Sequence, residues 1–436
     1  MASERRDVLH SWCVQADWHA PRVVGGQGAH LLLEDGSSVL DMSSQAECSN
    51  LGHQHPRVVA AIRDQAQRLC YVANAWGAAP RAELAARLLE LSGFEGGRVF
   101  FTLGGADANE HAVKFARQAS GLRNGLILTG DRSYHGASYM GMALSGDART
   151  AGRVDEAALG VAHFAAPDAY RSQASPDDCG LMAAEAVREA IVQASGRVAA
   201  VMLEPNAGTN GVIAPDSYWP AVRAATREAG VWLIADEVMS AFGRCGEWFA
   251  WRRHGEAGRP DIMTLAKGLT GAALPLGAVV VSAEVAGRLE HQMLATGLTY
   301  GGHPLCCAAG LGAIAAYEDE DLIARSRRLG GAMLAELKAM QARHAVIGDV
   351  RGGHGLFAVI ELVADRASKA PLAPWPSRPP GLEALTRAAL AQGVSFATRG
   401  NLILLAPPLV IAERDLAGAL ALLDRLIGRF FPEKQS

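Results

Sequence analysis

Residues 260–271 read PDIMTLAKGLTG, and the lysine in this stretch decides how the rest of the chain is interpreted. Lys267 lies among small and apolar neighbours, where a charged side chain is rare unless it has a function. An arginine stays protonated, whereas a desolvated lysine can lose its proton and attack a carbonyl. A surface lysine at a strand-to-helix turn would fit the same local window. Of the 41 Lys and Arg residues, the lysines are Lys114, Lys267, Lys338, Lys369 and Lys434.

Around this stretch, short apolar runs alternate with helical patterns, which predicts an α/β fold with a mostly parallel central sheet flanked by helices. After about residue 300 the pattern changes to helices followed by short strands, which indicates a smaller α+β domain. We expect an N-terminal segment and hairpin over residues 1–56 that joins the small domain, a large domain over 57–310 and a C-terminal small domain over 311–436. The expected strands of the large sheet are Val99–Thr102, Gly125–Thr129, Ala199–Leu203, Val231–Ala235, Ile262–Leu265 and Ala278–Ser282.

Composition excludes several classes of function. The chain has 436 residues, a net charge of -4 and a pI of about 6.4, so a nucleic-acid or membrane partner is not expected. No run of about 18 apolar residues and no signal-type N-terminus is present. Seven cysteines without a Cys-x-x-Cys pair fit free thiols in a reducing cytoplasm, and no metal-ligand spacing is recognisable.

Three features upstream of Lys267 predict a cofactor site. Gly104 and Gly105 precede a helix, whose free N–H groups suit a phosphate, although two glycines before a helix are common. Asp236 ends the apolar run 231–235, where a carboxylate needs a cation or a polarised donor. The chain lacks the phosphate-binding loop with which such an acid would serve an NTPase. Tyr134 follows a strand and supplies a flat aromatic, unless it is a core residue. A phosphate site, an acid, an aromatic and an amine are together what pyridoxal 5′-phosphate requires.

With the motif at 260–271 and Asp236 about thirty residues before it, the chain resembles the class III (ω-amino acid type) aminotransferases, which are fold-type I pyridoxal phosphate enzymes. The resemblance runs from about Trp18 to the C-terminal helix, and is strongest to the taurine–pyruvate aminotransferases. It implies that Lys267 forms a Schiff base with the cofactor and then carries a proton, while Asp236 pairs with the pyridine nitrogen. The further cofactor contacts that it implies are Gly105 and Ala106 at the phosphate, Tyr134 and Val238 on the two ring faces, His135, and Thr299 from the neighbouring subunit of a homodimer.

The same resemblance implies the substrate contacts. Arg399 would bind a carboxylate or sulfonate, although many members have their arginine at the position of Ala397. Glu204 matches a glutamate that can pair with a mobile substrate-binding arginine. Trp18 and Trp76 are expected pocket walls, unless they belong to the core.

Two positions depart from the family pattern. Ala106 lacks the usual hydroxyl at the phosphate. Glu47 stands where relatives have an apolar or aromatic residue, and we expect it to read a second positive group on the donor. An orientation of Glu47 toward solvent, or a pair with an arginine, remains the alternative.

The sequence therefore predicts a cytoplasmic, homodimeric aminotransferase with shared active sites. It would move an amino group from an amine or ω-amino acid to a keto acid, with pyruvate expected, through two half-reactions. The same motifs fit an aminomutase or an amino-acid racemase, because they determine the first proton removal and not the step after it. A non-catalytic protein that kept the fold is the third alternative, against which the intact set of Lys267, Asp236 and Tyr134 argues.

Overall fold

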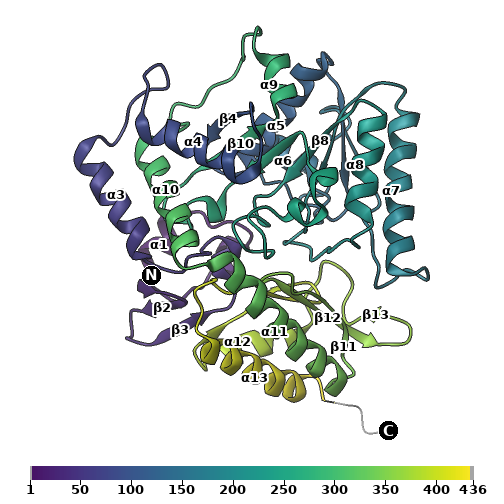
Figure 1. Cartoon of the computed structure of the whole chain (residues 1–436). Helices are drawn as coiled ribbons and strands as arrows, with labels where there is room; N and C mark the ends of the chain where they lie inside the picture. The colour runs from purple at the N-terminus through teal and green to yellow at the C-terminus, as the bar shows by residue number, and fades with distance from the viewer. Residues whose placement is uncertain (1, 433–436) are drawn as a thin grey trace.

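A seven-stranded sheet forms the centre of the larger part of the molecule in the computed structural model, which describes residues 2–432 (Figure 1). Five neighbouring strands pair in parallel, and β10 is antiparallel to the strands on both its sides, so the predicted mostly parallel sheet is confirmed. The spatial order is β4 (Arg98–Thr102), β10 (Gly277–Val281), β9 (Ile262–Leu265), β8 (Trp232–Asp236), β7 (Val198–Leu203), β5 (Leu126–Gly130) and β6 (Val161–Phe164).

Helices cover both faces of this sheet because its strands are apolar on both sides. Along β7, Ala200 and Met202 pack with one group of core residues, while Val201 and Leu203 pack with another. The first group includes the buried face of α5, and the second includes α7 and α8, which lie side by side (Figure 1). The helices of this part are α3 (Pro56–Arg68), α4 (Ala79–Ser92), α5 (Gly105–Ser120), α6 (Tyr139–Leu144), α7 (Pro176–Gln193), α8 (Tyr218–Glu228), α9 (Ala283–Leu289) and α10 (Pro304–Asp319).

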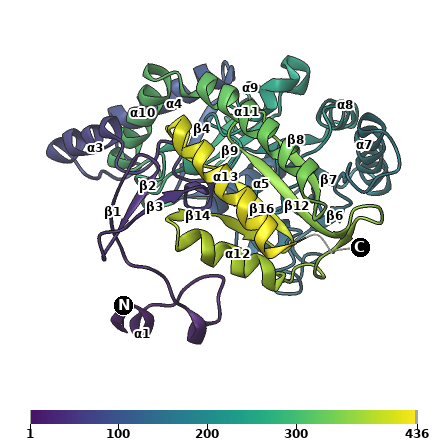
Figure 2. The same ribbon diagram turned by 90° about the horizontal axis from the view of Figure 1, so that it is seen from below.

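A second, antiparallel sheet forms the smaller part, with α11, α12 and α13 packed around it (Figure 2). Its strands are fully apolar over β16 and over most of β12, so they are buried beneath these helices. The sheet follows the order β11 (Ile347–Gly352), β12 (Ala358–Asp365), β16 (Leu402–Leu405) and β15 (Ala397–Arg399), and β13 (Ala370–Pro371) pairs with β12. The helices are α11 (Leu322–Arg343), α12 (Pro380–Leu390) and α13 (Glu413–Phe430).

A third sheet joins the two ends of the chain. It contains the predicted hairpin, extended by β1, in the order β1 (Val23–Gln27), β2 (His30–Leu33), β3 (Ser38–Asp41) and β14 (Val394–Ser395). The parallel pairing of β14 with β3 ties the N-terminal segment to the C-terminal part. On this basis we propose the three-part division at residues 56 and 310. Its outermost positions, 1 and 433–436, lie outside the described residues.

The structure determines where two helices begin and adds one short strand to the large sheet. Helix α5 begins at Gly105, and its first turn carries small and polar residues instead of the apolar repeat that marks the rest. Helix α8 begins at Tyr218. Strand β6 was not expected, since it has four residues and two of them are only partly buried. In residues 2–432, no helix is both long and apolar enough to cross a membrane.

Candidate active site

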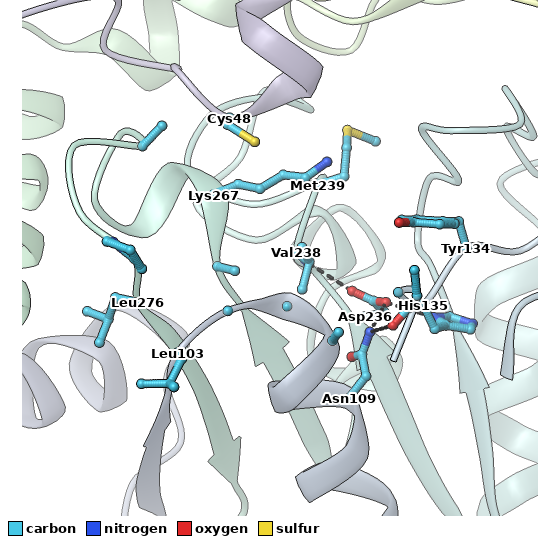
Figure 3. A pocket seen from close by; sticks show the side chains of 18 of the residues that line it. Cys48, Leu103, Asn109, Tyr134, His135, Asp236, Val238, Met239, Lys267 and Leu276 are labelled. Carbon is cyan, nitrogen blue, oxygen red and sulfur yellow. Dashed lines mark hydrogen bonds and ion pairs between the residues drawn. The ribbon is translucent and has the colours of Figure 1, made fainter. Parts of the chain in front are cut away.

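A cavity of about 410 Å³ opens where several strands of the large sheet end, and Lys267 and Asp236 both line it (Figure 3). The carboxyl ends of parallel strands are the usual place for a ligand in such sheets, and the volume suits a small organic molecule. Cys48, from the N-terminal segment, lines the same cavity. The predicted residues Gly105, Ala106, Tyr134, His135, Glu204, Asp236, Val238 and Lys267 are all among its lining.

The start of helix α5 forms one end of the cavity. Ala108 N–H donates to Gly104 O, and the N–H groups of the first turn before it have no acceptor within the helix. A side chain at position 105 would place its Cβ 2.8 Å from Val238 Cγ1, so a glycine is required for Val238 to pack there. This bare helix end, which carries a partial positive charge, can hold a phosphate.

Asp236 is held at the end of β8 with its carboxylate facing the cavity, and it is 3% exposed. Its Oδ2 lies 2.7 Å from Asn109 Nδ2 and 2.7 Å from His135 Nδ1. Its Oδ1 accepts from Val238 N–H at 3.0 Å. The other ring nitrogen of His135 lies 3.1 Å from Thr129 Oγ1, so the ring is fixed at both ends. Asp236 is therefore a rigid acceptor, able to pair with a protonated nitrogen of a bound ring.

The neighbouring Glu237 points away from the cavity and has a structural role. Burial raises its pKa to about 7, against hydrogen bonds from Ser240 Oγ and Trp251 N–H that favour the charged form. Its pKa in the unfolded chain is near the ordinary value of 4.5, so the folded chain keeps a proton that the unfolded chain has lost. Stability should therefore fall as the pH rises from about 4.5 to about 7.

We expect Glu237→Gln to flatten this pH dependence, because the amide cannot titrate. Thermal unfolding of the wild type and the variant at a series of pH values between 4.5 and 8 would measure it. From the low to the high end of that pH range, the Tm of the variant should rise by a few degrees relative to the Tm of the wild type. Parallel pH profiles would show that Glu237 is not the group that titrates.

Lys267 follows β9 and opens the helical turn Lys267–Leu269, with a φ of 46°. Its Nζ donates to Glu47 Oε2 at 3.0 Å, and its side chain is 20% exposed. Burial lowers the pKa of Lys267, but the Glu47 carboxylate outweighs this effect, and the pKa lies above its ordinary value. The amine is therefore protonated at neutral pH while the pair persists. In this structure Glu47 thus pairs with a lysine. The sequence alone allows three other surroundings for Glu47: solvent, an arginine, or a positive group on the donor.

The turn that carries Glu47 has an unusual backbone. Its φ angles are 48° at Ser44, 48° at Gln45, 66° at Ala46 and 57° at Glu47. Four successive left-handed residues other than glycine each cost about 1–2 kcal/mol, so the surroundings must enforce the turn. Such strain is found where a side chain has to be placed for function.

Buried hydrogen bonds hold this turn in place. Ser44 Oγ donates to Ala406 O at 2.6 Å and accepts from Arg244 Nη2 at 2.9 Å. Asp41 Oδ1 accepts from Ser43 N–H at 3.0 Å and from Ser43 Oγ at 2.9 Å. The position of Glu47 is therefore determined by residues from the N-terminal sheet and from both larger parts of the chain.

Tyr134 lies over the cavity, and its backbone N–H donates to Glu204 Oε1 at 2.8 Å (Figure 3). Burial and the nearby Asp236 raise the pKa of Glu204 well above its ordinary value. The expected pairing of Glu204 with an arginine is not found among residues 2–432, where Glu204 instead positions Tyr134.

Arg399 ends β15, is not among the residues that line the cavity, and makes no ion pair within the described part of the chain. Burial and the nearby Arg149 lower its pKa, while Asp147 and Glu47 oppose that effect. Arg149 is held by Asp147, with Nη2 2.7 Å from Oδ2, and its guanidinium lies 3.9 Å from the ring centre of Trp12.

Sequence reasoning missed Trp12, Arg149 and Asn109 as site residues. Trp12 reaches the site because the N-terminal arm folds back, so that its ring centre lies 6.3 Å from that of Tyr134. No local signal marks this contact or the Arg149–Asp147 pair. Asn109 could have been found, since an amide on the buried face of a predicted helix needs a partner.

Five expected residues are not among those that line the cavity of this chain: Glu47, Arg399, Trp18, Trp76 and Thr299. Trp76 is 69% exposed, and Thr299 is also exposed. Trp18 stacks on His10 with ring centres 3.6 Å apart, which makes it part of the N-terminal arm rather than a wall of the cavity.

The residues present fit pyridoxal phosphate. The fixed carboxylate of Asp236 faces the cavity, and Lys267 also lines the cavity. The start of α5, where Gly105 allows Val238 to pack closely, forms one end of the cavity. The donor set thus offers an anion site, an acceptor for a ring N–H and an amine around one space.

Known proteins resemble this chain over almost its whole length. A family model described as aminotransferase class-III matches residues 15–427. A taurine–pyruvate aminotransferase of Rhodobacter capsulatus is 32% identical, covering 98% of this chain and 96% of its own. A leucine/methionine racemase of Thermococcus litoralis is 35% identical, covering 89% and 86%. A solved structure of the taurine:2-oxoglutarate aminotransferase of Bifidobacterium kashiwanohense, in complex with PLP and glutamate, matches with a TM-score of 0.91 at 32% identity, covering 98% and 96%.

Proposed function

The chain belongs to the class III aminotransferases and uses pyridoxal 5′-phosphate, and from this premise we propose that it moves an amino group from an amine or ω-amino acid to pyruvate by a ping-pong mechanism. The observation that carries the proposal is the placement of Lys267 and Asp236 on one cavity at the start of α5. When bound, the cofactor supplies an aldehyde that captures amines and a ring that accepts electrons from the neighbouring carbon.

We assign the roles in this reaction to side chains and backbone N–H groups that line the cavity. Lys267 Nζ would hold the cofactor covalently and, when free, would carry a proton from the donor carbon. Asp236, fixed by Asn109 and His135, keeps a proton on the ring nitrogen. The N–H groups of Gly105 and Ala106 bind the phosphate. Tyr134 and Val238 pack on the two faces of the ring.

Substrate binding follows from the remaining groups of the site. Arg399 would take the carboxylate of the keto acid, since it is a cation without an ion-pair partner among residues 2–432. The taurine–pyruvate relative supports pyruvate as the acceptor.

The quaternary structure and location are part of the proposal. We place Thr299 at the phosphate of a second copy, which makes the enzyme a homodimer with shared active sites. The seven free cysteines support a cytoplasmic location.

Incubation of the holoenzyme with a donor amine and no acceptor tests the proposed reaction. We expect one equivalent of carbonyl product per active site, a loss of the visible absorbance, and recovery of the absorbance with formation of alanine when pyruvate is added. Product formation that continues without an acceptor would contradict transamination.

The second candidate is an amino-acid racemase, which the relative from Thermococcus litoralis favours. A racemase would keep its visible absorbance and would interconvert the enantiomers of an amino acid without any keto acid. Polarimetry of the same donor-only incubation separates the two activities.

A further inference from the structure

Glu47 is a buried carboxylate that has one ion-pair partner within residues 2–432, the lysine of the proposed chemistry. It is 7% exposed, and Lys267 Nζ lies 3.0 Å from its Oε2. A carboxylate this deeply buried needs a cation or several hydrogen-bond donors. Once Lys267 Nζ is attached to the cofactor, it no longer offers a free ammonium group to Glu47.

The two other cations near Glu47 do not take the place of Lys267. Arg244 is fully buried, and its terminal nitrogens already donate to Leu356 O, Pro407 O, Ser44 Oγ and Asn50 Oδ1. Arg399 forms no ion pair with Glu47, although that carboxylate opposes the lowering of the Arg399 pKa by burial and by Arg149. The loaded site therefore contains a buried carboxylate that has lost its ammonium partner.

The position of this carboxylate is fixed by the backbone that carries it. The four residues of the turn are left-handed, and Arg244, Ser44 and Asp41 hold the turn. Strain of this kind persists only where the surroundings enforce it, and it is found most often at functional sites.

We propose that Glu47 binds a second ammonium group on the amino donor, so that the preferred donors are diamines rather than monoamines. This inference rests on the proposed transamination and adds the donor class to it. The donor amine that reacts and the cation that is recognised are then two different groups of one molecule.

Paired donors test the inference. We expect the kcat/KM for 1,4-diaminobutane, divided by that for butylamine, to fall about 10- to 150-fold in Glu47→Gln, the range of a lost hydrogen bond to a charged group. Taking the ratio removes any effect that Glu47 has on Lys267, because that effect is common to both donors. Glu47→Asp keeps the charge and should recover part of the ratio.

A binding measurement gives a second readout that does not depend on turnover. Calorimetry with the Lys267→Ala protein loaded with pyridoxal phosphate measures the Kd of each amine without turnover and with no lysine beside Glu47. The diamine should bind at least about 10-fold tighter than butylamine to this protein, and the preference should be lost when Glu47→Gln is added. The wild type alone, tested with diamines of three to five carbons, should show the preference at one chain length even if the variants fail to fold.

Two outcomes would overturn the inference. An equal loss for diamine and monoamine would assign Glu47 to Lys267 alone. A raised KM for pyruvate with an unchanged donor ratio would make Glu47 the counter-ion of Arg399. In both cases amino transfer from butylamine to pyruvate would still be observed, whereas its absence with every donor would contradict the proposed function itself.

Discussion

Lys267→Ala should reduce amino transfer by at least about 10⁴-fold and remove the visible absorbance of the holoenzyme at the same time. Lys267 is the lysine that lines the cavity, and it lies at the end of β9 with its amine directed at Glu47. We assign two tasks to one nitrogen, covalent binding and proton movement, so no neighbouring group can replace it in part. Absorbance spectroscopy and a coupled alanine assay would measure both effects.

Two further variants separate the amine from its charge. Lys267→Arg keeps a cation beside Glu47 but cannot form an imine, so it should be as inactive as the alanine variant. Lys338→Ala removes an exposed lysine on α11 and should leave absorbance and turnover unchanged. Turnover with normal absorbance in Lys267→Ala would show that another residue holds the cofactor.

Asp236→Asn should lower the rate of the first half-reaction about 10²–10³-fold, with a smaller effect on cofactor retention. The amide has nearly the shape of the carboxylate but no charge, so it cannot keep a proton on a ring nitrogen. Hydrogen bonds from Asn109 and Val238 to Asp236 would be weakened or rearranged, while the phosphate site at α5 is untouched. Stopped-flow spectroscopy would measure the rate, and fluorescence would measure the bound cofactor.

Asp236→Glu serves as the matched control, because it preserves the charge with a displaced carboxylate. It should be faster than Asp236→Asn if the charge is what matters. Equal rates in the two variants, or an unchanged rate in Asp236→Asn, would show that Asp236 has a structural role. His135 would then be the next residue to test, since its ring contacts the same oxygen at 2.7 Å.

The parts of the site that were predicted from sequence are those attached to regular elements. Asp236 ends a strand and Gly105 begins a helix, and both strands and helices leave a periodic pattern of apolar residues. The mostly parallel sheet was predicted for the same reason. Lys267 was recognised because it interrupts an apolar stretch.

The rest depends on contacts that no local pattern encodes. Trp12 reaches Arg149 through the fold of the N-terminal arm. The left-handed turn before Cys48 contains no glycine, so nothing in its residues indicates positive φ angles. The pair of Glu47 with Lys267 joins residues 220 positions apart, and only the assembled sheets bring them together.

The pairing of β14 with β3 has a consequence for how this enzyme can diverge. Asp236 and the segment before Lys267 belong to the seven-stranded sheet, whereas the turn with Glu47 follows β3 in the sheet that the C-terminal β14 completes. The groups to which we assign the reaction and the carboxylate that we propose as the donor contact therefore belong to different sheets. We therefore expect mutations in the turn to change which amines the enzyme accepts while the reactive groups keep their geometry. Related enzymes could then differ in their amino donors and still catalyse the same reaction.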